Sequence, residues 1–173
     1  VFTHKGSRSG FLSFLGWYFS SKSEYVFQKE PWQKELFAKY ISESSFIEEL
    51  NQDEVCQCKE VEMLSFEEED YTKKDTLYLS PILKLKKYVN ENLKEYLLDF
   101  LIHGSMSTLD YRIGWSDLDT LIIIKKEVLR SSNKLQDLRK HILNIIPLLY
   151  EIDPLQHHEF IITTEKAILH ESY

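Results

Sequence analysis

Two short groups of residues in the middle of the chain could together bind a divalent metal and a phosphate. His103, Gly104 and Ser105 end one apolar segment, and Asp117 and Asp119 stand at the start of the next. Side chains at positions i and i+2 of an extended strand point to the same face, so the two carboxylates would lie side by side. Their repulsion needs a compensating cation, and hard oxygen ligands favour Mg²⁺ or Mn²⁺.

The Gly104-Ser105 turn would supply the phosphate-binding half of such a site. Glycine lets the backbone approach a ligand closely, and amides at the start of a helical turn, here over 107–110, can donate to phosphate oxygens. Each part alone is common in proteins. Their combination, with an apolar strand before the glycine and another after the second aspartate, is a considerably more specific signal of a metal and phosphate site.

Apolar runs predict the strands that position these residues. Three runs, over 97–103, 118–124 and 157–163, have the length and composition of short buried strands. The first feeds the glycine turn and the second follows the aspartates. We therefore expect the candidate site at one end of a small sheet.

Helical patterns stand before and between these strands. Ser80 followed by Pro81 is typical of an N-cap and a first-turn proline, which predicts a helix over 81–95. Apolar residues at intervals of three and four predict a second, amphipathic helix over 131–150. The alternation of helices and strands predicts an α+β fold with α/β layers, a small mixed sheet with helices packed on it.

The first half of the chain, residues 1–79, has a mixed composition and is interpreted as an accessory segment. A first-turn proline and an apolar stripe predict a helix over 31–50, and an acidic stretch follows. We assign residues 80–173 to the catalytic core. Because the chain begins with Val1 and stops soon after the start of an expected last helix, we expect it to be a fragment truncated at its C-terminus.

The charge of the chain is concentrated in one segment. Residues 43–70 hold eleven acidic residues and one lysine, a local charge of −10 in a chain of net charge −7, so the remainder carries +3. Nucleic-acid binding needs clustered lysine and arginine and is disfavoured. The acidic segment is interpreted as a solvated face or, alternatively, as a docking surface for a basic protein partner.

Cysteine use and hydropathy indicate a cytoplasmic protein without a membrane anchor. The two cysteines, Cys56 and Cys58, are too close to bridge each other readily, and we expect reduced thiols. The apolar run over 11–19 is much shorter than the ~20 residues that a membrane span needs.

At Ile102-His103-Gly104-Ser105 and Asp117-Leu118-Asp119 the chain resembles the nucleotidyltransferase superfamily of the polymerase-β-like fold. The resemblance covers about residues 80–165. It implies that Asp117 and Asp119 hold the metal ions and that Gly104 and Ser105 contact the phosphates of a nucleoside triphosphate. It also implies a third carboxylate on a neighbouring strand, for which Glu159 is the candidate.

The resemblance implies the transfer of a nucleoside monophosphate from the triphosphate to a hydroxyl or phosphate of a small-molecule or protein acceptor, with release of pyrophosphate. Two departures from the family pattern keep an alternative open. Glu159 replaces the usual aspartate, and Ser107-Thr108-Leu109 replaces a triplet with arginine, which leaves Arg112 as the basic residue of that loop. The alternative is an inactive nucleotide-binding or protein-interaction module of the same fold.

Four further residues near the motif have two interpretations each. One of His157 and His158 could face the site as a base or ligand, although ordinary strand histidines are the simpler reading. His103 is interpreted as a strand-end histidine satisfied by the backbone or, alternatively, as a contact to substrate. Trp115 could stack on a base, but a core aromatic that anchors the loop is the favoured interpretation.

Overall fold

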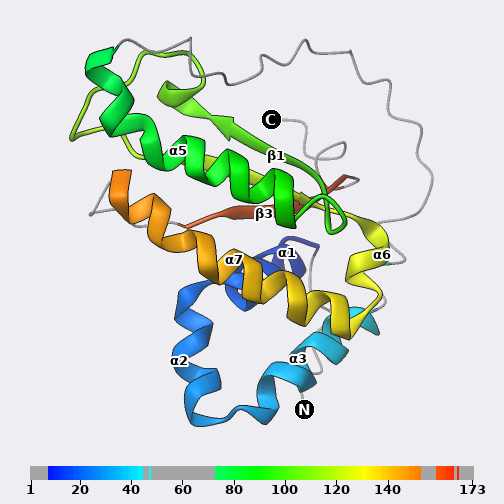
Figure 1. Ribbon diagram of the computed structural model, residues 1–173. Helices are drawn as coiled ribbons and strands as arrows, with labels where there is room; N and C mark the ends of the chain where they lie inside the picture. The colour runs from blue at the N-terminus through cyan, green and yellow to red at the C-terminus, as the bar shows by residue number, and fades with distance from the viewer. Residues whose placement is uncertain (1–7, 45–46, 48–72, 153–158, 166, 168–173) are drawn as a thin grey trace.

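Residues 8–44, 47, 73–152, 159–165 and 167 are described in the computed structural model of the chain (Figure 1). The elements in chain order are helices α1 (Arg8–Phe19), α2 (Ser21–Lys29), α3 (Trp32–Ser42) and α5 (Lys73–Asn92), strands β1 (Leu97–His103) and β2 (Asp119–Ile124), helices α6 (Lys126–Leu129) and α7 (Ser132–Ile152), and strand β3 (Ile161–Thr164). A 3₁₀ turn, Gly104–Met106, follows β1 directly.

The three strands form one mixed sheet in the order β1, β2, β3. β1 and β2 are antiparallel, with His103 opposite Asp119. β2 and β3 are parallel, with Leu121 opposite Ile161. Because of these directions, the end of β1 and the start of β2 meet at the same edge of the sheet. The predicted fold of a small mixed sheet with helices packed on it is confirmed.

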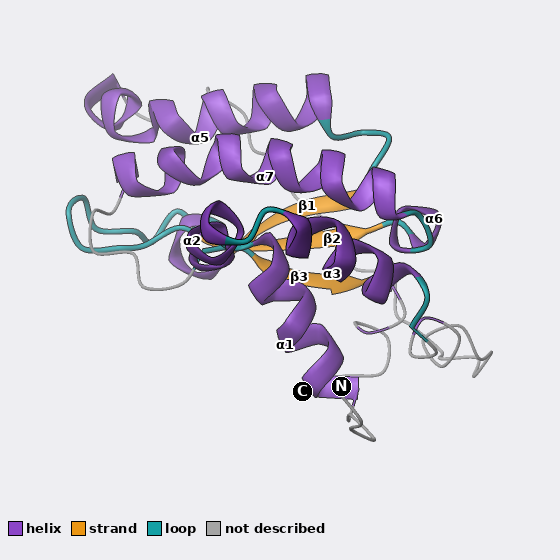
Figure 2. Ribbon diagram, turned by 90° about the horizontal axis from the view of Figure 1, so that it is seen from below, coloured by secondary structure: helices purple, strands orange, loops and turns teal. Residues whose placement is uncertain are grey.

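Helices α5 and α7 lie side by side over one face of the sheet (Figures 1 and 2). The apolar residues of α7 that were predicted to form its inner stripe are all buried; they are Leu135, Leu138, Ile142, Ile145 and Leu149. A stripe repeating every three to four residues presents one continuous apolar face, which explains why this helix seats on the core.

The N-terminal helices belong to the same hydrophobic core as the sheet. α1 contacts β3 and α7, and α3 contacts α7. Leu15, Tyr18 and Phe19 of α1, with Ala38 and Ile41 of α3, are buried in one cluster with the residues of β2 and α7. The helical N-terminal segment is therefore a layer that closes the β3 side of the fold.

The predicted start of α5 is wrong, because this helix begins at Lys73 and Pro81 lies inside it. A proline in a helix interior removes one hydrogen bond and costs about 3 kcal/mol. Leu79, Ile82 and Leu85 around it are buried, and their burial offsets that cost. Packing of the continuous apolar face thus outweighs the local capping signal at Ser80.

Two other boundaries differ in part from the sequence prediction. The helix predicted over 31–50 is observed as α3, which ends at Ser42, and most of the remaining stretch lies outside the described residues. The third strand begins at Ile161, later than the predicted 157. His157 and His158 lie outside the described residues. Within the part of the chain that is described, no helix has the length and apolar character needed to cross a bilayer.

Candidate functional site

The turn after β1 brings the backbone of Gly104 against the carboxylate of Asp119. Gly104 has a φ of 69°, in the left-handed region that favours glycine. A Cβ at this position would lie only 2.5 Å from Asp119 Oδ2. The turn therefore needs glycine for its backbone conformation and for the space that the carboxylate occupies. The predicted approach of the Gly-Ser turn to the second aspartate is confirmed.

The rest of the turn is held by its own hydrogen bonds. The Ser107 amide and hydroxyl donate to the Gly104 carbonyl at 3.2 and 2.8 Å, and the Asp110 amide donates to the Ser105 carbonyl at 3.0 Å. Met106 is fully buried and anchors the turn in the core. The expectation that the 107–110 amides face a phosphate is wrong for Ser107 and Asp110, because both amides already have carbonyl partners.

Leu118 orients the two aspartates at the start of β2. Its side chain is fully buried, while Asp117 and Asp119 on either side are partly exposed. In extended backbone, alternate side chains point to opposite faces, so this burial pattern is the one expected if both carboxylates point away from Leu118. The structure places Asp119 beside the glycine turn, and the position of Asp117 on the same face stays a prediction.

The donor chemistry of this pair fits a magnesium ion whose remaining ligands come from substrate. Mg²⁺ is commonly held by one or two carboxylates together with phosphates and water. Among the described residues, no group of three or more His, Cys, Asp or Glu side chains could hold a metal ion. Asp117 and Asp119 are the residues that would hold such a metal, whose other ligands would be phosphate and water.

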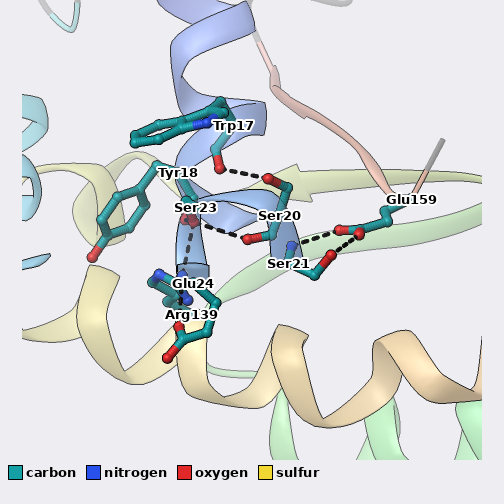
Figure 3. A network of polar contacts seen from close by, with 8 residues as sticks. All are labelled: Trp17, Tyr18, Ser20, Ser21, Ser23, Glu24, Arg139 and Glu159. Carbon is teal, nitrogen blue, oxygen red and sulfur yellow. Dashed lines mark hydrogen bonds and ion pairs between the residues drawn. The ribbon is translucent and has the colours of Figure 1, made fainter. Parts of the chain in front are cut away.

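Glu159 precedes β3 by two residues, so the prediction that it lies within the strand is wrong. Its Oε2 accepts a hydrogen bond of 2.9 Å from the Ser21 amide, and its Oε1 accepts one from the Ser21 hydroxyl (Figure 3). These contacts place a carboxylate at the positive N-terminal end of α2.

Arg139 of α7 is a buried cation that sequence reasoning missed. Its side chain is 1% exposed, and Nη2 lies 2.7 Å from Ser23 Oγ and 2.9 Å from Glu24 Oε2. The guanidinium stands over the Phe27 ring, with Cζ at 4.8 Å from the centroid. Burial lowers the pKa of Arg139, and the charge of Glu24 opposes this shift.

The spacing of α7 carried a signal for this residue. Arg139 follows Leu135 by four positions and precedes Ile142 by three, so it falls on the apolar stripe. A charged residue on that stripe must be paired when it is buried. The identity of its partners on α2 depends on packing between distant segments and has no local signature.

The loop between the turn and β2 exposes two of the predicted residues. Arg112 is exposed, and its amide donates to Ser116 Oγ at 2.9 Å. Trp115 is 84% exposed, so its favoured interpretation as a core aromatic is wrong. The loop is anchored by Tyr78 of α5, whose hydroxyl donates to the Ser116 carbonyl at 3.1 Å and whose ring stacks on Tyr111.

No known protein family, curated protein or solved structure matches the chain.

Proposed function

We propose that the chain is the catalytic part of a metal-dependent nucleotidyltransferase with a polymerase-β-like core. The reaction would move a nucleoside monophosphate from a nucleoside triphosphate to a hydroxyl or phosphate of a small-molecule or protein acceptor. The observation that carries the proposal is that the Asp119 carboxylate lies beside Gly104 at the end of the antiparallel pair where the loop joins β1 to β2. It supports the proposal because a candidate metal ligand and the candidate phosphate-binding turn lie next to each other.

Asp117 and Asp119 are the residues that would hold Mg²⁺ or Mn²⁺. When bound, the metal neutralises the triphosphate and stabilises the attacking and leaving oxygens. Gly104 and Ser105 would meet the β and γ phosphates, because the turn that they form lies beside the carboxylate of Asp119. Arg112 is exposed on the next loop and would add a positive charge on the phosphate side.

The chemical step exchanges one bond at the α-phosphorus for another. The acceptor oxygen forms a bond to the α-phosphorus, the bond from the α-phosphorus to the bridging oxygen breaks, and pyrophosphate leaves. The acceptor proton passes to a carboxylate, for which Glu159 is the candidate. Each carboxylate oxygen has two acceptor positions, so the hydrogen bonds from Ser21 leave Glu159 with capacity for a proton or a ligand.

The contact between Glu159 and Ser21 also favours a second candidate function. If Glu159 serves only to cap α2, the core lacks its third carboxylate and becomes a nucleotide-binding module without turnover. In agreement with this reading, no three-carboxylate group is assembled among the described residues. The two functions predict the same binding of a metal and a triphosphate but differ in pyrophosphate release.

Incubation of the chain with each labelled nucleoside triphosphate and Mg²⁺ or Mn²⁺, with small-molecule and protein acceptors, tests the enzyme. We expect transfer and pyrophosphate release that fall to background in Asp119→Asn, which removes one metal-binding charge at nearly constant shape. Activity that survives this substitution would exclude the proposal.

The variants Glu159→Gln and Ser21→Ala separate the two functions. For an enzyme, Glu159→Gln abolishes turnover with triphosphate binding retained, and Ser21→Ala retains turnover. For an inactive module, wild type and both variants bind triphosphate equally and none releases pyrophosphate.

A further inference from the structure

The loop over 112–116 presents Trp115 outward on a well-braced turn. The amides of Trp115 and Ser116 both donate to the Arg112 carbonyl, at 3.0 and 2.9 Å. Gly114 lies between Arg112 and Trp115 and has a φ of 76°, a conformation that glycine adopts without strain. The indole is 84% exposed, the most exposed large aromatic ring of the described residues. A ring so exposed contributes little to the core.

The brace comes from both sides of the turn. The Arg112 amide donates to Ser116 Oγ at 2.9 Å, and the Tyr78 hydroxyl donates to the Ser116 carbonyl at 3.1 Å. The stacked pair of Tyr78 and Tyr111 fixes the entry of the loop to α5. The backbone of the loop that carries Trp115 is thus anchored to α5 through Tyr78, although the indole itself is exposed.

Chain geometry keeps Trp115 close to the aspartates. One residue, Ser116, separates Trp115 from Asp117, so their Cα atoms lie at most about 7 Å apart. Asp119 in turn lies against Gly104. A nucleotide whose phosphates occupy the space between the turn and the aspartates extends beyond this distance at its base end. The exposed indole therefore stands where the base of such a nucleotide can reach it.

We propose that Trp115 is the stacking platform for the nucleobase of the triphosphate, an inference that rests on the proposed function. An indole offers a broad π face, and stacking of a base on an aromatic ring is favourable for every base. Stacking alone discriminates weakly between bases. The site therefore selects for a nucleoside triphosphate over a bare polyphosphate, and it tolerates more than one base.

Calorimetric titration of the full chain with two kinds of probe tests this role. One probe is each α,β-methylene nucleoside triphosphate with Mg²⁺, which cannot be cleaved at the reacting bond. The other is inorganic tripolyphosphate with Mg²⁺, which has the phosphates but no base. The variants are Trp115→Ala and Trp115→Phe. Trp32→Ala is the matched control, because Trp32 of α3 is also exposed, at 59%, and lies outside the loop.

We expect Trp115→Ala to weaken nucleotide binding about tenfold and to leave tripolyphosphate binding unchanged. Trp115→Phe retains most of the affinity, and Trp32→Ala behaves as wild type. Equal loss for both probes would show that Trp115 only supports the loop, and unchanged nucleotide binding in Trp115→Ala would exclude stacking; either result overturns the inference while the proposed function stands. If wild type binds neither probe, the proposed function fails and this inference fails with it.

Discussion

One glycine sets the geometry of the candidate site. Gly104 combines a left-handed backbone with a position for a Cβ that the carboxylate of Asp119 already occupies. Gly114 has a similar φ of 76°, but nothing lies within 4 Å of the position that its Cβ would occupy. Both positions therefore need glycine for the left-handed backbone, and only Gly104 also needs it for the space beside Asp119. This difference makes the two glycines a matched pair for substitution.

Gly104→Ala and Gly114→Ala should separate backbone strain from the contact with Asp119. Each alanine in the left-handed region costs about 1 kcal/mol of unfolding free energy. Only Gly104→Ala also displaces the carboxylate, so only this variant should lose the binding of Mg²⁺ with tripolyphosphate. Thermal unfolding and calorimetry measure the two effects. Equal binding by both variants would contradict the assigned role of Gly104.

The sequence predicted the residues whose placement is local. The motif predicted Asp119 beside the Gly104 turn, and the structure shows this contact. Trp115 was misassigned because exposure depends on whether another segment covers the ring. The partner of Glu159 was not predictable either, since Ser21 lies 138 positions away.

At the scale of the elements, Arg139 links α7 to α2. Its guanidinium contacts Ser23 and Glu24 (Figure 3). It also stands over the Phe27 ring. The Glu24 side chain is 30% exposed, so solvent screens part of the charge pair. The packing of the arginine stem and the hydrogen bond to Ser23 lie in the buried part of this contact.

Arg139→Ala should lower the free energy of unfolding by about 3 kcal/mol, because it removes the buried stem and leaves Glu24 without its cation. Arg139→Met should cost less, since it keeps most of the packing volume. Urea unfolding followed by circular dichroism measures both. The control is Lys140→Ala: this neighbour pairs with Asp137 at the surface and should unfold as wild type does. A similarly small effect at Arg139 would mean that α2 is held by its apolar contacts alone.

The elements also show where sequence patterns reach their limit. The bounds of β1 agree with the predicted 97–103, although Asp99 interrupts the apolar run. The prediction that this strand is buried is wrong, because only Leu97 is buried. The start of α5 does not agree, because Ser80 and Pro81 are a capping signal that buried Leu79 and Ile82 override. Capping contributes about 1 kcal/mol, and burial of two large apolar side chains contributes more.

At the scale of the whole molecule, the chain builds one core from both of its halves. The buried faces of α1 and α3 contribute to the same apolar cluster as the sheet and α7. Figure 1 shows the three N-terminal helices gathered on the β3 side of the fold. The sequence predicted the α+β class and the helical nature of this segment. The packing of α1 against β3 is a tertiary contact between distant segments, and no local sequence pattern predicts it.

A chain that begins at Lys73 should therefore fail to fold cooperatively. Removal of α1 to α3 exposes the apolar surface that β3 and α7 present to Leu15, Phe19 and Ile41. We expect strong binding of a hydrophobic dye, loss of the near-ultraviolet circular dichroism signal and a broad thermal transition, compared with the full chain. A sharp transition for the shortened chain would show that residues 73–173 form an independent domain.

The register of the sheet also sets an order of assembly. His103 meets Asp119 across a single loop, whereas Leu121 meets Ile161 only after the chain has passed through α6 and α7. Closing the shorter loop costs less entropy, and contacts that are local in sequence form sooner. During synthesis, Gly104 and both aspartates also leave the ribosome well before Glu159. The proposed metal-binding and phosphate-binding residues therefore come together before Glu159, the candidate acceptor-side carboxylate, joins them.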